Sequence, residues 1–256
     1  MSRGAAARPD AGVELGIDTA SADASLALRR GGSVLALRRW RVETTLSREL
    51  LAELGALLDG AGVRRGEIAR VAVCSGPGAY TALRTGVATG QGLALGLAVP
   101  LAGVSRLEAD ALPHLDAARP VVAVHDAGRG RLAWAAYRAA SRPGAAPREV
   151  AAPRADDAAG LARDAPAGAL WCGELTEELR RELARAGRPL GAGDAAAGPA
   201  AGRRSAVGVL RLAWLHDAFG DPAGGDAVYL RPPPITRPRA AGPAHPSGPT
   251  SAALRE

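Results

Sequence analysis

The sequence predicts an α/β fold with a mixed sheet, and three observations point to it. The chain opens with an antiparallel β-meander, continues with alternating helix and strand patterns, and repeats this layout in a degraded form in its second half. Of its 256 residues, 47% are hydrophobic and 23% are charged, which is enough apolar material for one large or two small domains. Aromatic residues make up only 3%, so alanine, leucine and valine must fill the core.

The first half of the chain shows strong periodicity. Its predicted elements are, in order, strands over residues 13–18, 24–30 and 33–40, a helix over 47–60, a strand over 68–74, a helix from the loop at 75–81 to about residue 97, a strand over 99–104 and a helix over 105–115. Gly31 and Gly32 are a two-residue hairpin signal. Ser47 is the expected N-cap of the first helix, and Ser105 and Glu108 have the spacing of a capping box.

The hydrophobic periodicity that predicts helices and strands is weaker in the second half of the chain. We expect strands over residues 120–124, 131–138 and 169–172, helices over 176–186 and 205–219, a small-residue linker over 191–202 and an extended segment over 228–230. The stretch over 141–156 is rich in proline and alanine and shows no clear element. Val207, Leu210, Trp214 and Ala218 should lie on one side of the last helix.

We expect the chain to have five parts, of which the two terminal ones are indicated by composition. They are a disordered leader over residues 1–11, an N-terminal subdomain over 12–105, a smaller second subdomain over 106–202, a C-terminal helix and extended segment over 203–231 that returns to the first subdomain, and a disordered proline-rich tail over 232–256. Such terminal segments cannot bury enough apolar surface to offset the entropy of ordering them.

Charge and cysteine content exclude several classes of protein. The net charge of +6 would suit a nucleic-acid partner, but all 32 basic residues are arginines in a composition rich in alanine and glycine, and some lie in the leader and tail. The uncharged stretch over 85–105 contains too many glycines to span a membrane. Cys74 and Cys172 stand apart from metal-ligand or redox spacing, which indicates a reducing compartment and a cytoplasmic location.

A glycine-rich strand-to-helix loop and an acidic strand end are the candidate anion site. Gly76 and Gly78 expose the backbone before the helix that includes Thr81, while Asp18 and Thr19 end the first strand. The segment after Asp18 contains no glycine, and its Cβ atoms should hinder a phosphate. The site is therefore predicted to be weak or vestigial, and a tight turn that needs its glycines for shape alone remains the alternative.

Two helices offer apolar stripes to a possible partner chain. The residues of this candidate interface are Leu50, Leu54, Leu57, Leu58, Leu83, Val87, Gly90, Ala94 and Leu97. A helix that is apolar on all sides must be covered on all sides, either by another chain or within the protomer, and the sequence leaves both alternatives open.

No catalytic or metal-binding residue can be assigned. The four histidines have no helical ligand spacing, and Cys74 precedes Ser75, so the motif of a nucleophilic serine elbow is absent.

Four motifs together resemble the TsaB (YeaZ) family. They are Leu15-Gly16-Ile17-Asp18-Thr19-Ala20; the run from Gly76-Pro77-Gly78 through Leu83-Arg84-Thr85-Gly86; Gly90-Gln91-Gly92 with Gly103-Val104-Ser105-Arg106-Leu107-Glu108; and Val228-Tyr229-Leu230-Arg231. The resemblance implies an actin/Hsp70/sugar-kinase-like fold of two subdomains, the second reduced. It also implies a noncatalytic dimerisation subunit that supports TsaD, the transferase that forms threonylcarbamoyladenosine in tRNA next to the anticodon.

The resemblance carries further expectations about cofactors and partners. It implies no intrinsic cofactor, although ATP and Mg²⁺ could act through the complex. The implied partners are TsaD, a TsaE-type ATPase and, for the chain alone, a second copy, with tRNA bound only through the complex and no membrane contact. Leu46 stands where the family usually has histidine and Arg131 replaces an acid, whereas Asp126 and Arg129 are kept.

Three other functions remain as alternatives. The chain could be an active ATP-dependent kinase or ATPase of the same superfamily, although the missing hairpin glycine is unfavourable to it. A metallopeptidase would require a bound metal, and an RNA-binding module would require salt-dependent affinity for tRNA.

Overall fold

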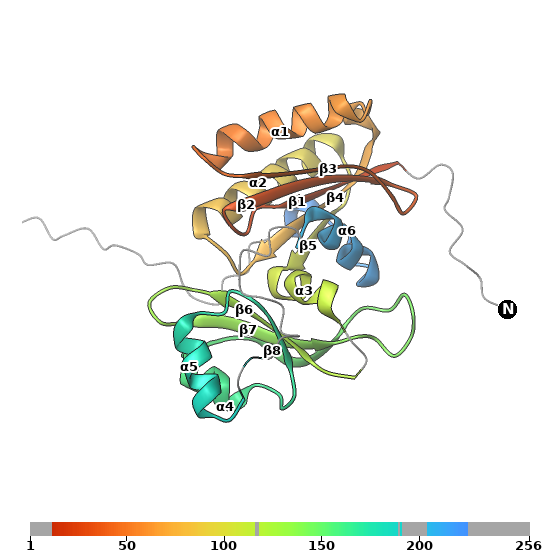
Figure 1. Ribbon diagram of the computed structural model, residues 1–256. Coiled ribbons are helices and arrows are strands. Elements are labelled where there is room, and N and C mark those ends of the chain that lie inside the picture. Colours follow the sequence, from red (N-terminus) through yellow and green to blue (C-terminus); the bar gives the residue numbers. More distant parts are fainter. Residues whose placement is uncertain (1–11, 116–117, 189, 191–203, 225–256) are drawn as a thin grey trace, which may run out of the picture.

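The computed structural model describes residues 12–115, 118–188, 190 and 204–224 (Figure 1). The first sheet contains β1 (Val13–Asp18), β2 (Asp23–Arg30), β3 (Ser33–Arg41), β4 (Ile68–Gly76) and β5 (Leu101–Ser105). The second contains β6 (Val121–Asp126), β7 (Leu132–Arg138), β8 (Arg148–Asp156) and β9 (Leu170–Gly173). The helices are α1 (Leu46–Gly60), α2 (Tyr80–Leu97), α3 (Arg106–Ala111), α4 (Ala158–Asp164), α5 (Glu177–Arg185) and α6 (Ala206–Leu215).

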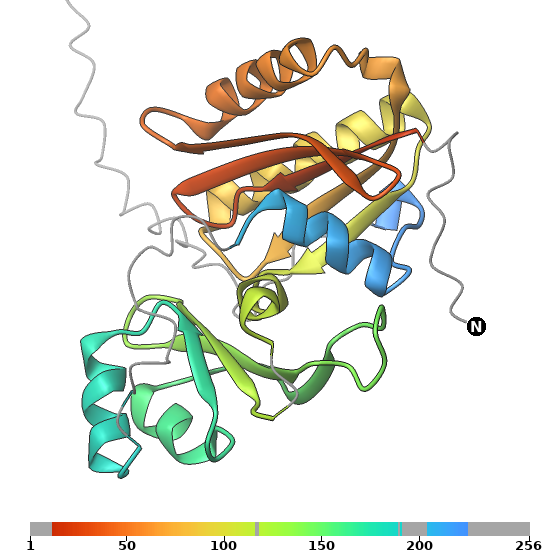
Figure 2. The ribbon, with the colours of Figure 1, turned by 45° about the vertical axis from the view of Figure 1, so that its right-hand side comes forward.

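Helices and sheets alternate in layers, as Figures 1 and 2 show. Helices α1 and α2 cover one face of the first sheet, and α6 covers its other face. Helix α3 packs on the inner face of the second sheet and contacts α6, while α4 and α5 lie on the outer face. The predicted α/β class with a mixed sheet is confirmed, and two helices lie between the sheets.

The two sheets repeat one topology. The first has the strand order β3-β2-β1-β4-β5 and the second has β8-β7-β6-β9. In each, an antiparallel meander of three strands is followed by a strand that pairs in parallel with the first strand of the meander. Asp18 and Asp126, the last residues of β1 and β6, therefore occupy equivalent positions in the two sheets.

Most predicted elements are present with small differences in their ends. The hairpin at Gly31-Gly32 is formed, with both glycines at positive φ. β3 is an edge strand that is largely exposed and carries three arginines, which is typical of sheet edges. The leader, the linker over 191–202, the segment over 228–230 and the tail over 232–256 lie outside the described residues.

Ser47 is not the N-cap of α1, and Ser105 is the N-cap residue of α3 but does not form the predicted capping box. Helix α1 begins at Leu46 after Thr45, two residues before the predicted Ser47. Ser105 makes no side-chain cap of α3, since its hydroxyl bonds Tyr137. Glu108 instead bonds His216 Nε2 at 2.6 Å.

The sequence did not predict β8 or α4. The β8 sequence has low strand propensity, because Val150 is its only β-branched residue and it contains Pro153. Its pairing with β7 supplies the hydrogen bonds that the local sequence does not specify. At α4, Asp157 is the N-cap and accepts a hydrogen bond from Gly160.

Of the residues predicted to share one side of the last helix, Leu210 is buried and Val207 and Ala218 are half-buried, whereas Trp214 is exposed. The buried residues of α6 are Ala206, Val209, Leu210, Leu212 and Ala213. Trp214 is 42% exposed, and its indole N–H donates to Glu14 Oε1 at 2.8 Å. Because alanine and leucine occur all around α6, the sheet decides which side is covered.

Glycine allows α2 to lie close to the first sheet. A Cβ atom at Gly90 would approach Val73 Cγ1 of β4 to 2.3 Å, so any larger residue would push the helix away. Gly92, two residues further along the same helix, has no neighbouring atom within 4 Å of such a Cβ.

These two glycines make a matched pair for a stability test. We expect Gly90→Ala to lower the free energy of unfolding by about 1–3 kcal/mol through overpacking. Gly92→Ala should raise it by about 0.5–1 kcal/mol, because alanine has the higher helix propensity. Urea unfolding of the isolated chain measures both, and equal effects of the two substitutions would contradict the close approach at Gly90.

Candidate functional site

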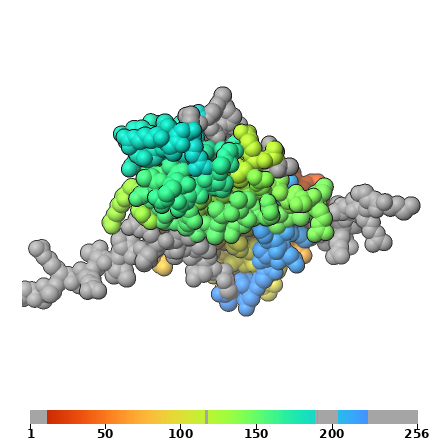
Figure 3. Space-filling view, turned by 90° about the horizontal axis from the view of Figure 1, so that it is seen from below, coloured from red at the N-terminus to blue at the C-terminus, as the bar shows by residue number. Residues whose placement is uncertain are grey.

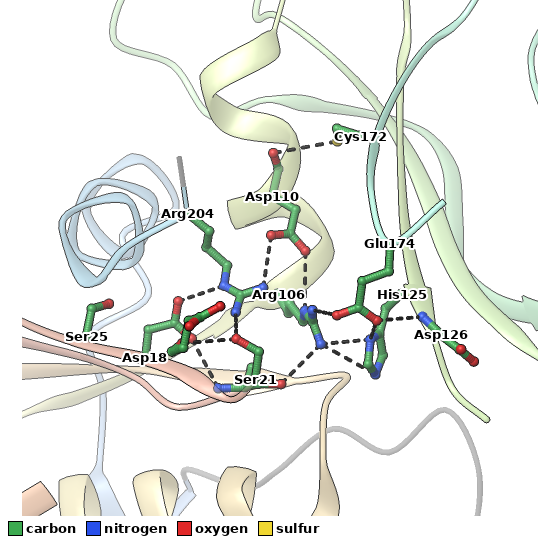
Figure 4. Close-up of polar contacts among 12 residues, drawn as sticks. Asp18, Ser21, Ser25, Arg106, Asp110, His125, Asp126, Cys172, Glu174 and Arg204 are labelled. Carbon is green, nitrogen blue, oxygen red and sulfur yellow. Dashed lines mark hydrogen bonds and ion pairs between the residues drawn. The ribbon is translucent and has the colours of Figure 1, made fainter. Parts of the chain in front are cut away.

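A buried arginine closes the acidic end of β1 (Figure 4). Asp18 is only 1% exposed, and Arg204, just before α6, donates from Nε to Asp18 Oδ2 at 2.7 Å. The same guanidinium donates to Asp110 Oδ1 at 3.0 Å and to Ser21 Oγ at 2.7 Å. Burial alone would lower the pKa of Arg204, but the charges of Asp18 and Asp110 outweigh it and raise that pKa.

A second buried arginine joins the two sheets. Arg106, in the first turn of α3, donates to the Ala20 carbonyl at 3.1 Å and to Asp110 Oδ2 at 3.3 Å. Its other contacts are to the second sheet, with Glu174 after β9 and with His125 Nδ1 at 2.7 Å. The side chain is 3% exposed, so each of these partners compensates a charge that water does not reach.

On the second sheet, the carboxylate of Glu174 contacts both Arg106 and His125. Its Oε2 lies 2.8 Å from His125 Nδ1 and accepts a hydrogen bond from the Asp126 backbone N–H at 3.0 Å. Burial alone would raise the pKa of Glu174, but the His125 hydrogen bond and the Arg106 charge hold that pKa well below its ordinary value.

The predicted anion-site residues lie close together but pack against one another. Thr19 Oγ1 donates to the Ala82 carbonyl at 3.0 Å, in the first turn of α2. Gly76 has φ of 111°, whereas Gly78 is needed for space, since a Cβ there would lie 2.6 Å from the Ala20 carbonyl oxygen. Thr81 is exposed.

A magnesium-nucleotide does not fit the residues at this position. The Asp18 carboxylate, which would face such a cation, is bound by the Arg204 guanidinium and by the Ala20 N–H at 3.2 Å. The hairpin after β1 packs onto Gly78 and α2, where phosphate would approach.

The candidate interface is corrected by the structure. Eight of its nine residues are buried within the protomer: Leu50, Leu54, Leu57, Leu58, Leu83, Val87, Gly90 and Ala94; Leu97 is half-buried. Packing against the first sheet covers this side of both helices. On the outward side, Leu51 is 58% exposed on α1 and Leu95 is 59% exposed on α2.

Within the described ranges, no group of three or more histidine, cysteine, aspartate or glutamate residues could hold a metal ion. Cys74 and Cys172 are both buried, and burial raises the pKa of both thiols. Among the same described residues, no helix is long and apolar enough to cross a bilayer.

The sequence did not identify the residues of the buried network apart from Asp18. Arg204 and Asp18 are 186 residues apart, and Arg106 and Glu174 are 68 apart. A possible signal was the acid at Asp110, four residues after Arg106 on one helix side. Nothing local marks Arg204, since many arginines in this chain lie on the surface.

The chain matches the family model described as TsaD, tRNA N6-adenosine threonylcarbamoyltransferase, over residues 42–187. The tRNA threonylcarbamoyladenosine biosynthesis protein TsaB of Escherichia coli K12 is 35% identical over 126 residues, 48% of this chain and 54% of that protein. A tRNA N6-adenosine threonylcarbamoyltransferase of Nitratidesulfovibrio vulgaris is 37% identical over 38% of this chain and 31% of its own. The chain thus spans about half the length of the TsaB relative.

The solved structure of YeaZ from Pseudomonas aeruginosa has the same fold. It superposes with a TM-score of 0.67 at 24% identity and covers 85% of this chain and 99% of its own. The expected α/β architecture, with two mixed sheets of which the second is the smaller, is confirmed.

The Arg204 network can be tested by unfolding. Arg204→Met leaves the buried Asp18 carboxylate without its cation and leaves Asp110 with Arg106 alone, so we expect a loss of about 3–5 kcal/mol in the free energy of unfolding. Adding Asp18→Asn should recover part of that loss, because it removes one buried charge. Arg185→Met, which breaks an exposed pair with Glu182, is the control and should change little. A loss for Arg204→Met no larger than that of the control would contradict this role.

The lowered pKa of Glu174 predicts a pH dependence of stability. The folded state binds fewer protons at this group than the unfolded chain, so its contribution is present above the ordinary glutamate pKa of about 4.3 and is lost as pH falls below it. Unfolding curves between about pH 3 and pH 6 should therefore show a shallower decline for Glu174→Gln than for the wild type. Glu177→Gln is the exposed control, and parallel curves for all three proteins would disprove the expectation.

Proposed function

This chain belongs to the family of TsaD-type tRNA N6-adenosine threonylcarbamoyltransferase domains and, within that family, to the TsaB (YeaZ) proteins. On that premise we propose that it is a noncatalytic subunit. In this role it binds TsaD and supports formation of threonylcarbamoyladenosine next to the anticodon of tRNA. The threonylcarbamoyl group passes from its adenylate to the adenosine on the partner, and tRNA meets this chain only through the complex.

One observation carries the noncatalytic assignment. Arg204 neutralises Asp18, the acid that would hold a cation near phosphate in an active member of this fold, and burial makes that pair inaccessible. The same observation counts against an ATP-dependent kinase or ATPase. We propose that the chain has no intrinsic cofactor and that ATP and Mg²⁺ act elsewhere in the complex, with a TsaE-type ATPase as a further component.

The outward side of α1 and α2 supports a partner-binding role. Leu51 and Leu95 are exposed on these two helices together with several small residues, among them Ala52, Ala88 and Gly92. Small residues permit close approach of another helix pair, and the two leucines add exposed apolar area. We propose that TsaD binds this side and that a second copy of the chain can occupy it when TsaD is absent.

The interface is tested with charge substitutions that leave the core intact. We expect Leu51→Arg and Leu95→Arg each to abolish the complex with TsaD in size-exclusion chromatography with light scattering, because each places a charge in an apolar contact. Both side chains are more than half exposed, so the variants should keep the melting temperature of the wild type.

Val150→Arg is the matched control. Val150 is 39% exposed on β8 of the second sheet, away from α1 and α2, and its substitution should leave the complex unchanged. Persistence of the complex in both leucine variants would refute the interface. Transfer of threonylcarbamoyl to tRNA by the purified chain alone would refute the noncatalytic assignment.

A further inference from the structure

A second candidate site lies at the hairpin between β6 and β7. A cavity of about 270 Å³ is lined by Asp126 at the end of β6, by Arg129 in the turn, and by Thr176 and Glu178 at the start of α5. β6 and β9 run parallel, and α5 follows β9, so the cavity lies at the carboxyl ends of parallel strands. In open α/β sheets ligands bind at this edge. The space-filling view in Figure 3, seen from below, shows the residues of the second sheet and its helices, in green to teal, over much of that face of the molecule.

Charged side chains of both signs line this cavity, and they form few hydrogen bonds or ion pairs with the rest of the described chain. Arg129 and Glu178 are exposed, and neither makes a hydrogen bond or ion pair with any residue in the part of the chain that the structure describes. Asp126 uses one carboxylate oxygen to accept from the Gly128 N–H at 2.8 Å. Leu132 and Ala158 add apolar lining.

The backbone at Arg129 is unusual for a residue with a side chain. Its φ is 57°, between Gly128 at 75° and Gly130 at 70°, a left-handed run that glycine adopts without strain. Arginine is a poor choice for this conformation, and nothing within the described residues engages its guanidinium. Strain of this kind is concentrated at functional positions.

Asp18 in the first sheet occupies the position equivalent to Asp126, but its environment is different. Asp18 is buried and paired with Arg204, whereas Asp126, at the same point of the repeated topology, is exposed and only its backbone N–H joins the Glu174 network (Figure 4). The second hairpin therefore keeps an accessible carboxylate at the strand end where the first hairpin is closed.

The mixture of charges restricts the ligand. An anion bound by Arg129 would face the carboxylates of Asp126 and Glu178, and a cation bound by these two would face Arg129. A small zwitterion satisfies both, with its carboxylate toward the guanidinium and its ammonium toward the acids. The volume is below the roughly 300–1,000 Å³ of sites for drug-sized molecules, which sets the scale at a single amino acid.

We propose that the cavity at the β6–β7 hairpin binds a free α-amino acid through Arg129 and the Asp126 and Glu178 carboxylates. This site is distinct from the α1 and α2 surface and requires neither TsaD nor tRNA, so the proposal is independent of the proposed function.

The test is isothermal titration calorimetry of the full chain with each of the twenty L-amino acids, up to about 10 mM. We expect at least one of them to bind. Its N-acetyl derivative, which lacks the ammonium, and its methyl ester, which lacks the carboxylate, should each bind about tenfold or more weakly. No binding by any amino acid, or equal binding by either derivative, would overturn the proposal.

Arg129→Gly separates binding from folding. Glycine suits the left-handed φ, so this variant should melt at the wild-type temperature or above while its affinity for the amino acid falls about tenfold or more. Glu178→Gln should weaken binding in the same direction. Arg148→Gln, at an exposed arginine of β8 that does not line the cavity, is the matched control and should leave the affinity unchanged. Unchanged affinity in Arg129→Gly, or an equal loss in the control, would contradict the assignment.

Discussion

The ion pair between Arg204 and Asp18 is the constraint on which the rest of the molecule depends. A buried guanidinium requires partners for its charge and its N–H groups, and here Asp18, Asp110 and Ser21 provide them from three separate segments. The start of α6 is thereby fixed against the end of β1 and against α3. Arg106 extends the same constraint to the second sheet through Glu174 and His125. The acid at the end of β1 thus contributes to the junction between the sheets.

The repeated topology explains how one chain can keep a fold while its two strand ends differ. Each sheet ends its first strand in an aspartate, at a point where the backbone turns into a hairpin. In the first sheet the hairpin packs onto α2, with no space for a Cβ atom between Thr19 and Gly86 or between Ala20 and Gly78. In the second sheet the turn from Gly128 to Gly130 projects outward and borders an open cavity. The proposed amino-acid site therefore lies at the second hairpin, and the proposed partner surface lies on the helices of the first sheet.

The two helices α1 and α2 show why apolar periodicity has to be interpreted together with packing. Their regular stripe of leucine, valine, alanine and glycine matches the first sheet, and the close approach at Gly90 demands a small residue for that reason. The surface that remains for another chain consists of the positions between the stripes, where Leu51 and Leu95 are exceptions among small and polar residues. Leucines at these positions are unfavourable in water, which is consistent with a covered interface.

By itself the sequence determined the α/β class, the opening hairpin, most elements of both sheets and the resemblance to the TsaB family, because these rest on local periodicity, glycine turns and contiguous motifs. It indicated Asp18 as a weak or vestigial site from the absence of a glycine in the next residues. Only the tertiary structure decided that Arg204 is the partner of Asp18, that β8 forms beside β7, and which sides of α1, α2 and α6 are buried. These features depend on contacts between residues far apart in the chain, and no local pattern encodes the free energy of such contacts.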